Sequence, residues 1–263
     1  MLRPENYETI KIEKQDGVAI LTLNRPERLN AVNGAMHSEL MQMFLDVQAD
    51  GEIRVAVLTG AGRAFCAGGD FGGGSDMRSK SGLSMMQEAR RIVDNLLDCE
   101  KPIVCAVNGA AAGLGATIAL LCDVVVASRN ARIGDPHVKM GITAGDGGAV
   151  IWPLLVGVNK AKYMLMTGDL VTADEAMAMG LLNKVVDEGE ALNEATAIAR
   201  RLANGAPFAV QSSKIAVNKF IKAVSNLVLP LSLSLEEASM TKADHGEAVK
   251  AFQEKREPKF TGR

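Results

Sequence analysis

Apolar positions along the chain follow two kinds of pattern, short aliphatic runs and longer stretches with helical spacing. The run at 55–58 is continuously apolar, as in a buried strand, whereas Met36, Leu40, Phe44 and Val47 recur every three or four residues. In the first half of the chain this predicts strands at 9–13, 18–23, 55–58, 102–107 and 124–127, with helices at 35–48, 85–97 and 113–121. Short strands that alternate with helices predict an α/β fold with right-handed connections.

After about residue 147 the predicted elements are mostly helical. Helices are predicted at 148–156, 160–166, 173–178, 192–203 and 208–224, and one last strand at 181–186. Thr172 and Glu175 have the spacing of a capping box at the start of the third of these helices. From about Pro207 the chain is predicted to be helical only. We therefore divide it into a core over 1–200 and a helical region over 201–263, which we expect to pack against a neighbouring subunit.

Composition excludes several classes of function. The 263 residues are 48% hydrophobic and 23% charged, with a net charge of −2 and few aromatic residues, which predicts a globular protein that does not bind nucleic acid. The apolar runs are too short to span a bilayer and the N-terminus lacks a signal-peptide core, so we expect a cytoplasmic protein without a membrane partner. The four cysteines show no Cys-x-x-Cys spacing, which predicts no metal site.

Two segments rich in small residues, 64–70 and 108–115, each follow an apolar strand-like run. Glycine and alanine let a ligand approach the backbone closely. Two backbone N–H groups directed at one carbonyl oxygen form an oxyanion hole, which stabilises negative charge on that oxygen. The pair of segments therefore predicts an enzyme that acts on an acyl group.

With these segments in place, the chain resembles the crotonase (enoyl-CoA hydratase/isomerase) superfamily from about residue 7 to 260. The motifs that carry the resemblance are Asn24-Arg25-Pro26, Phe65-Cys66-Ala67-Gly68-Gly69-Asp70, Ala106-Val107-Asn108-Gly109, Gly145-Asp146-Gly147-Gly148, Thr167-Gly168-Asp169 and Ala251-Phe252-Gln253-Glu254-Lys255-Arg256. The resemblance implies a spiral of ββα units with a helical C-terminal trimerisation region, in a homo-trimer or a dimer of trimers. It implies an acyl-CoA substrate whose thioester oxygen is bound by the Gly69 and Leu114 amides, and no permanently bound cofactor.

The same resemblance implies residues for binding the coenzyme A part of the substrate. Basic side chains at the mouth of the site would meet the phosphates, and the backbone of the first small-residue segment would meet the adenine. A neighbouring subunit would contribute two residues of the C-terminal tail. The residues implied are Arg25, Arg28, Cys66, Ala67, Gly68, Asp70, Lys101 and Thr117, with Phe252 and Lys255 from the neighbour.

The chain departs from its family at the two catalytic positions. Hydratases of the superfamily use two glutamates, which would fall at Thr117 and His137. A threonine hydroxyl cannot serve as a general base at neutral pH, but a histidine can. His137 and Asp146 lie nine residues apart, and we interpret them as a base with an orienting carboxylate. Asp146 also suits the N-cap of the following helix, and His137 a packed loop position.

These residues leave three functions open. The first is a hydratase-like enzyme of the superfamily. The second is a hydrolase of a β-diketone C–C bond or of a thioester, because the His–Asp pair is similar to that of 6-oxocamphor hydrolase; the further acidic residue of that enzyme would fall near Glu236. The third is a binding protein without chemistry. Glu236 is otherwise expected on a solvated helix face, and His37 and His245 on the surface.

Overall fold

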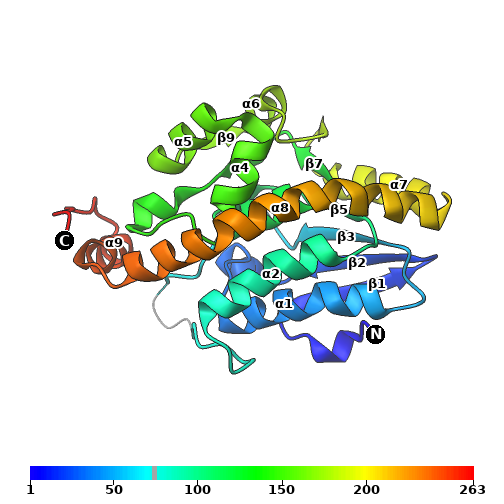
Figure 1. The fold of residues 1–263 in the computed structure, drawn as a ribbon, viewed down its shortest axis with the longest axis horizontal. Coiled ribbons are helices and arrows are strands. Elements are labelled where there is room, and N and C mark those ends of the chain that lie inside the picture. Colours follow the sequence, from blue (N-terminus) through cyan, green and yellow to red (C-terminus); the bar gives the residue numbers. More distant parts are fainter. Residues whose placement is uncertain (73–75) are drawn as a thin grey trace.

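Two β-sheets lie at the centre of the protein, which a computed structural model describes over residues 1–72 and 76–263 (Figure 1). The larger sheet has the order β1 (Ile10–Gln15), β2 (Val18–Leu23), β3 (Val55–Gly60), β5 (Ile103–Val107), β7 (Val124–Ser128) and β10 (Lys184–Val186). Only its β1–β2 pair is antiparallel. The smaller sheet has the order β4 (Ala64–Cys66), β6 (Ala110–Ala112), β8 (Arg132–Gly134) and β9 (Leu170–Thr172), and its first three strands are parallel.

The chain alternates between these sheets in repeated ββα units. In the first unit β3 enters the larger sheet, β4 the smaller one, and α2 (Met85–Asp98) follows. In the second, β5, β6 and α3 (Leu114–Leu121) repeat this path. In the third, β7 and β8 lead to a short 3₁₀ helix, η3 (Pro136–Met140). This arrangement confirms the predicted α/β fold with a crotonase-like spiral.

Alternating strand residues build a core on both faces of the larger sheet. On one face, valines of β3, β5 and β7 pack against alanines spaced four residues apart on α7 (Ala191–Ala203). The opposite face, with Ala56, Leu58 and Cys105, packs against α1 (Gly34–Ala49) and α2. Strands that are buried on both faces consist of continuous apolar runs, which is why they were recognisable in the sequence.

The C-terminal half adds a helical layer over this core. It consists of α4 (Gly148–Val156), α5 (Val158–Thr167), α6 (Ala173–Met179), α8 (Pro207–Met240) and α9 (Ala243–Glu254). In Figure 1, α8 crosses the molecule between α4 above it and α2 below it, and it packs against both. The predicted capping box is present, because Thr172 accepts from the Glu175 amide and Glu175 accepts from that of Thr172.

Six elements differ from the prediction. The strands β4, β6, β8 and β9 were missed because three residues are too few to show a periodicity. The predicted strand at 181–186 is reduced to β10, since Leu181 and Leu182 are buried in the turn after α6. The predicted helix at 208–224 extends to Met240 with Pro230 inside it.

Residues 73–75, part of the glycine-rich stretch that follows Asp70, lie outside the described residues. Among the helices described, none is long and apolar enough to cross a membrane.

Buried polar contacts attach α8 to the core. The Lys214 ammonium is buried, lies 2.8 Å from an Asp123 carboxylate oxygen, and donates to the Lys101 carbonyl at 2.8 Å. Asp123 in turn accepts from the Ile103 amide at 2.7 Å, at the start of β5. The Lys214 ammonium of α8 thus neutralises the Asp123 carboxylate, which accepts from the first amide of the central strand β5.

We expect Lys214→Met to lower the free energy of unfolding by about 2 kcal/mol, because it leaves the partly buried Asp123 carboxylate without a counter-charge. Lys222→Met is the matched control, since Lys222 lies on the same helix and its partner Asp98 is exposed; it should cost less than about 1 kcal/mol. Chemical denaturation measures both values. Equal losses would mean that the buried pair does not anchor α8.

Candidate active site

Three parallel strands of the smaller sheet deliver the predicted site residues to one edge. Gly69 follows β4, Leu114 begins the helix after β6, and His137 follows β8. These strands are neighbours in the sheet, so their carboxyl ends lie side by side. Residues separated by almost seventy positions in the chain therefore meet in one place.

The two predicted oxyanion-hole amides both line a cavity at this edge. Gly69 is held by a bridge to Val32, whose amide donates to the Gly68 carbonyl at 2.7 Å. Leu114 is the first residue of α3, where helix geometry leaves the N–H without a carbonyl partner. Gly113 permits the turn from strand to helix with φ at +54°. Among the described residues, neither amide donates to another protein group.

The cavity has a volume of about 230 Å³ and mostly apolar walls. Methionines form much of the surface, with Met77, Met85, Met86 and Met240 among the lining residues. The polar lining side chains are His37, His137, Asp146, Glu236 and His245. A cavity of this size that is apolar apart from a few titratable groups suits a short acyl chain beside reactive groups.

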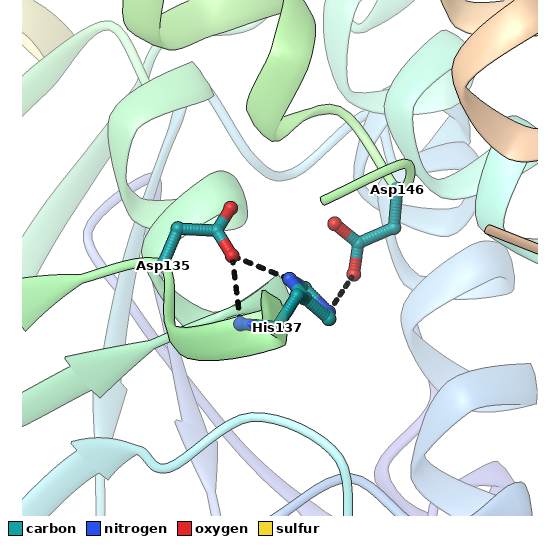
Figure 2. A group of neighbouring side chains, drawn as sticks. All are labelled: Asp135, His137 and Asp146. Atoms are coloured by element: carbon teal, nitrogen blue, oxygen red, sulfur yellow. Dashed lines mark hydrogen bonds and ion pairs between the residues drawn. The ribbon is translucent and has the colours of Figure 1, made fainter. Parts of the chain in front are cut away.

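His137 lies between two aspartates (Figure 2). Its Nδ1 atom is 2.5 Å from an Asp135 carboxylate oxygen, and its Nε2 atom is 3.4 Å from Asp146. All three residues are buried. Burial alone would lower the pKa of His137, but the two carboxylates outweigh it and raise that pKa well above the usual value. The ring is therefore a cation at neutral pH.

This geometry corrects the predicted roles of the dyad. Asp135, and not Asp146, orients the ring, because it caps η3 and binds Nδ1. Asp146 is not the N-cap of α4, since that position is occupied by Gly147 without a side-chain cap. The Asp146 carboxylate instead lines the cavity opposite Nε2. The sequence does contain a signal for Asp135. This aspartate directly precedes Pro136 and lies two residues before His137, a pattern typical of the start of a short helix.

Thr117 does not contact the cavity as predicted for a substrate-binding residue. It is fully buried in α3, behind Asp146, and its hydroxyl lies 3.5 Å from an Asp146 oxygen. Thr117 is not among the described residues that line the cavity. We therefore assign it a supporting contact to Asp146.

Glycines of the Gly145-Asp146-Gly147-Gly148 motif allow the charged groups to approach the backbone. A Cβ at Gly148 would lie 2.3 Å from an Asp135 carboxylate oxygen, and one at Gly145 would lie 2.6 Å from a Glu236 oxygen. Any side chain at either position would displace a titratable group of the site.

Glu236 is not on a solvated helix face, as the sequence had suggested. It is buried on α8, lines the cavity, and its Oε2 atom has no hydrogen-bond partner among the described residues. Burial, reinforced by the charge of Asp146, raises the pKa of Glu236 to about 8. The cavity therefore favours the protonated form of this carboxyl group. The sequence signal was weak because Glu236 and Glu237 adjoin, and only tertiary packing buries the first.

His37 and His245 are likewise not surface residues. Both rings line the cavity. His37 is 8% exposed and its Nδ1 atom lies 2.7 Å from Glu88. His245 is half-buried, with Nδ1 2.8 Å from the Met140 carbonyl and its ring edge-on to Phe71.

The residues predicted to bind coenzyme A are dispersed. Lys101 cannot reach the site, because it lies at the amino end of β5 with its buried ammonium bonded to the carbonyls of Val47 and Asp50. Arg25 pairs with Asp70 at 2.9 Å, so these two side chains hold the loop together. Arg28 is exposed nearby.

The remaining predicted contacts for coenzyme A involve backbone and tail. Cys66 is fully buried, and burial raises the pKa of its thiol to about 12, so only its backbone could meet a ligand. Ala67 is half-buried and Gly68 is buried. Phe252 and Lys255 are exposed at the end of α9, next to Gln253, which donates to the Phe71 carbonyl of the same chain at 3.4 Å.

A metal ion does not fit the charged cluster well. Asp135, His137 and Asp146 place ligand atoms within 4.8 Å of one another. The two carboxylates, however, face opposite nitrogens of a single ring (Figure 2). An ion on either nitrogen would thus have only one adjoining carboxylate.

Comparison with known proteins identifies the class. Residues 13–263 match the family model described as enoyl-CoA hydratase/isomerase. The chain is 37% identical to the short-chain-enoyl-CoA hydratase of Clostridium acetobutylicum, over 93% of this chain and 94% of that protein. It is 36% identical to the 1,2-epoxyphenylacetyl-CoA isomerase of Escherichia coli K12, over 97% and 99%. A crystal structure of an enoyl-CoA hydratase/isomerase from Mycobacterium paratuberculosis has a TM-score of 0.86 at 36% identity, covering 93% and 99%.

The chain therefore belongs to the enoyl-CoA hydratase/isomerase family, and it is an enzyme of that family with the crotonase fold. Membership implies an acyl-CoA thioester as the substrate. It does not by itself decide between hydration and isomerisation, since relatives of both names match almost the whole chain.

We expect Gly148→Ala to lower the pKa of His137, because the new methyl group displaces the Asp135 carboxylate that stabilises the imidazolium. NMR titration of the histidine ring protons measures this shift. Gly246→Ala is the matched control, since no atom lies within 4 Å of a Cβ there; it should leave the titration unchanged. An unaltered His137 titration in Gly148→Ala would mean that Asp135 does not control the ring.

Proposed function

We propose that the protein catalyses the reversible hydration of a short-chain enoyl-CoA thioester. The observation that carries this proposal is a pair of carboxyl groups that line one cavity in different surroundings. An Asp146 oxygen lies 3.4 Å from His137 Nε2, whereas Glu236 is buried, its Oε2 atom has no hydrogen-bond partner among the described residues, and burial raises its pKa to about 8. Two carboxyl groups in such different environments can act as an acid–base pair.

In this proposal the thioester oxygen lies between the Gly69 and Leu114 amides. Asp146 takes a proton from water as the water oxygen bonds to Cβ of the substrate. The electron pair of the C=C bond moves to the thioester oxygen, where the two amides stabilise the enolate. Glu236 then gives its proton to Cα. Proton exchange from Asp146 to Glu236 restores the starting state, and the His137 cation stabilises the Asp146 carboxylate again.

His137 serves as a charged partner rather than as the base that the sequence suggested. A protonated imidazole ring, here with a carboxylate oxygen beside each nitrogen, has no free lone pair to accept a proton. We therefore assign the base to Asp146, the carboxyl group beside Nε2 that lines the cavity.

Hydrolysis of a β-diketone or a thioester is the second candidate. The observation that favours it is the 3.4 Å separation of His137 and Asp146, since the same pair could activate water for attack on a carbonyl. The third reading, a binding protein without chemistry, is disfavoured by the buried titratable groups around the cavity, which a binding site for an apolar acyl chain does not need.

Crotonyl-CoA hydration, followed by the loss of enoyl absorbance, tests the proposal. We expect turnover by the wild type, and a loss of at least a hundredfold in kcat for both Asp146→Asn and Glu236→Gln, because each lacks one proton-transfer group. Thr117→Val is the matched control, since it removes a long contact to Asp146 but no proton carrier; its kcat should fall less than tenfold. Turnover of β-diketones without enoyl-CoA hydration would instead support the hydrolase.

The pH dependence follows from the raised pKa of Glu236. A general acid must be protonated, so kcat/KM of the wild type for crotonyl-CoA should fall as pH rises through about 8. The native state also holds this proton between pH 4.5 and 8 while the unfolded chain releases it, so stability should decline across that window. A Glu236→Gln variant should lose the second effect. Activity that is constant from pH 7 to pH 9.5 would contradict the role of Glu236.

We also propose that α8 forms a contact with a second copy of the chain, in a homo-trimer or a dimer of trimers. Exposed apolar residues form one stripe along it: Val217, Phe220, Leu227, Leu231 and Leu235. A contiguous apolar stripe on a soluble protein is typical of an interface. Sedimentation velocity should give an oligomer for the wild type and a monomer for Leu227→Glu/Leu231→Glu. Leu45→Glu, on α1, is the control and should remain oligomeric. A monomeric wild type would exclude the contact.

A further inference from the structure

A second histidine–carboxylate pair lies on the wall of the cavity, apart from the proton-transfer groups. His37, in the first turns of α1, lines the cavity, and its Nδ1 atom is 2.7 Å from Glu88. Glu88 is 1% exposed and lies on α2. Neither residue contacts Asp135, His137 or Asp146 by a hydrogen bond among the described residues. The proposed hydration makes no use of this pair.

Glu88 is a fully satisfied acceptor. Besides His37 it accepts from the hydroxyls of Ser38 at 2.7 Å, Ser79 at 2.7 Å and Ser81 at 2.6 Å. Burial by itself would raise the pKa of Glu88, but these hydrogen bonds outweigh it and lower that pKa to about 2. An ionised carboxylate only accepts, so the Nδ1 atom of His37 must carry a hydrogen. Glu88 thereby fixes both the orientation and the tautomer of the ring.

The opposite ring atom, Nε2, is left to meet a ligand. It has no hydrogen-bond partner among residues 1–72 and 76–263. The cavity lining contributed by α2 is apolar, with Met85, Met86 and Ala89. An alkyl chain that filled the cavity would displace water from Nε2 and leave this atom without a hydrogen bond. The binding free energy of a ligand without a matching polar group would be less favourable for that reason.

We propose that the acyl chain of the substrate carries an oxygen atom, as a hydroxyl or oxo group beyond C3, that hydrogen-bonds to His37 Nε2. His37 is then a specificity-determining residue and Glu88 a positioning residue. A neutral ring accepts from a hydroxyl, and a protonated ring donates to either oxygen. Because the bridge from Val32 to Gly69 places the start of α1 beside one oxyanion-hole amide, the oxygen lies close to the thioester end of the chain. This inference rests on the proposed acyl-CoA site.

Binding of saturated thioesters tests the inference without turnover. Pentanoyl-CoA, 4-hydroxypentanoyl-CoA and 4-oxopentanoyl-CoA have the same chain length and cannot be hydrated. Isothermal titration calorimetry of the wild type should give a Kd at least tenfold lower for one or both oxygenated thioesters, the value of one hydrogen bond. The two oxygenated probes distinguish a hydroxyl from an oxo group.

Variants separate recognition from support of the fold. His37→Phe should abolish the preference and bind pentanoyl-CoA at least as well as the wild type does, whereas His37→Gln should retain part of it. Glu88→Gln should weaken the preference, since it removes the charge that holds the ring. Ser38→Ala is the matched control, because it removes one donor to Glu88 and keeps the ring; its preference should persist.

A wild type that binds all three thioesters equally, or a preference that survives in His37→Phe, would overturn the inference. Loss of the preference in Ser38→Ala as strongly as in His37→Phe would also overturn it, since the pair would then only support the loop. Failure of the proposed hydration gives a different result. In that case crotonyl-CoA is not turned over while the oxygenated thioesters still bind more tightly.

Discussion

Parallel pairing of β4, β6 and β8 is the constraint on which the rest of the site depends. Each strand has only three residues, and each ends where a functional group begins. Because the strands run in the same direction, the Gly69 amide, the Leu114 amide and the Asp135–His137 pair arrive at one edge. The larger sheet holds these short strands in register, since each ββα unit contributes one strand to each sheet. An insertion in any unit would move one group away from the other two.

Charge in the site is organised by burial. His137 lies between Asp135 and Asp146, so one cation is shared by two buried carboxylates. Burial raises the pKa of Glu236, and the nearby charge of Asp146 raises it further. The glycines at 145 and 148 make the arrangement sterically possible, because a Cβ at either position would contact a carboxylate. The buried carboxyl groups of the cluster thus come from the N-cap of η3, the loop before α4, and α8.

The cavity has two kinds of polar wall. One wall, from η3, the loop before α4 and α8, contains the groups proposed to transfer protons. The other, from α1 and α2, presents His37 with its ring fixed by Glu88. The remaining surface is largely methionine, whose flexible side chains adapt to acyl chains of differing shape. The groups proposed to transfer protons and the group proposed to recognise the acyl chain therefore lie on separate elements around one small volume.

The sequence by itself determined the larger sheet, most helices and the family, and it singled out four residues that meet at one cavity. Continuous apolar runs mark strands buried on both faces, and the two small-residue segments mark the backbone donors. Gly69, Leu114, His137 and Asp146 all line the cavity as predicted. Their grouping was recognisable because motif order reflects strand order in a parallel sheet.

Tertiary structure alone decided the chemistry of the individual groups. Asp135, to which the sequence analysis gave no role, holds His137 Nδ1 in place of Asp146, because the direction in which a ring nitrogen points depends on η3 and not on spacing. Glu236, His37 and Glu88 have the sequence signature of surface helix residues, yet long-range packing of α8, α1 and α2 buries them. Lys101 looked like a phosphate ligand, but its place at the amino end of β5 removes it from the site. Burial and hydrogen-bond partners set protonation states, and both are properties of the packed fold.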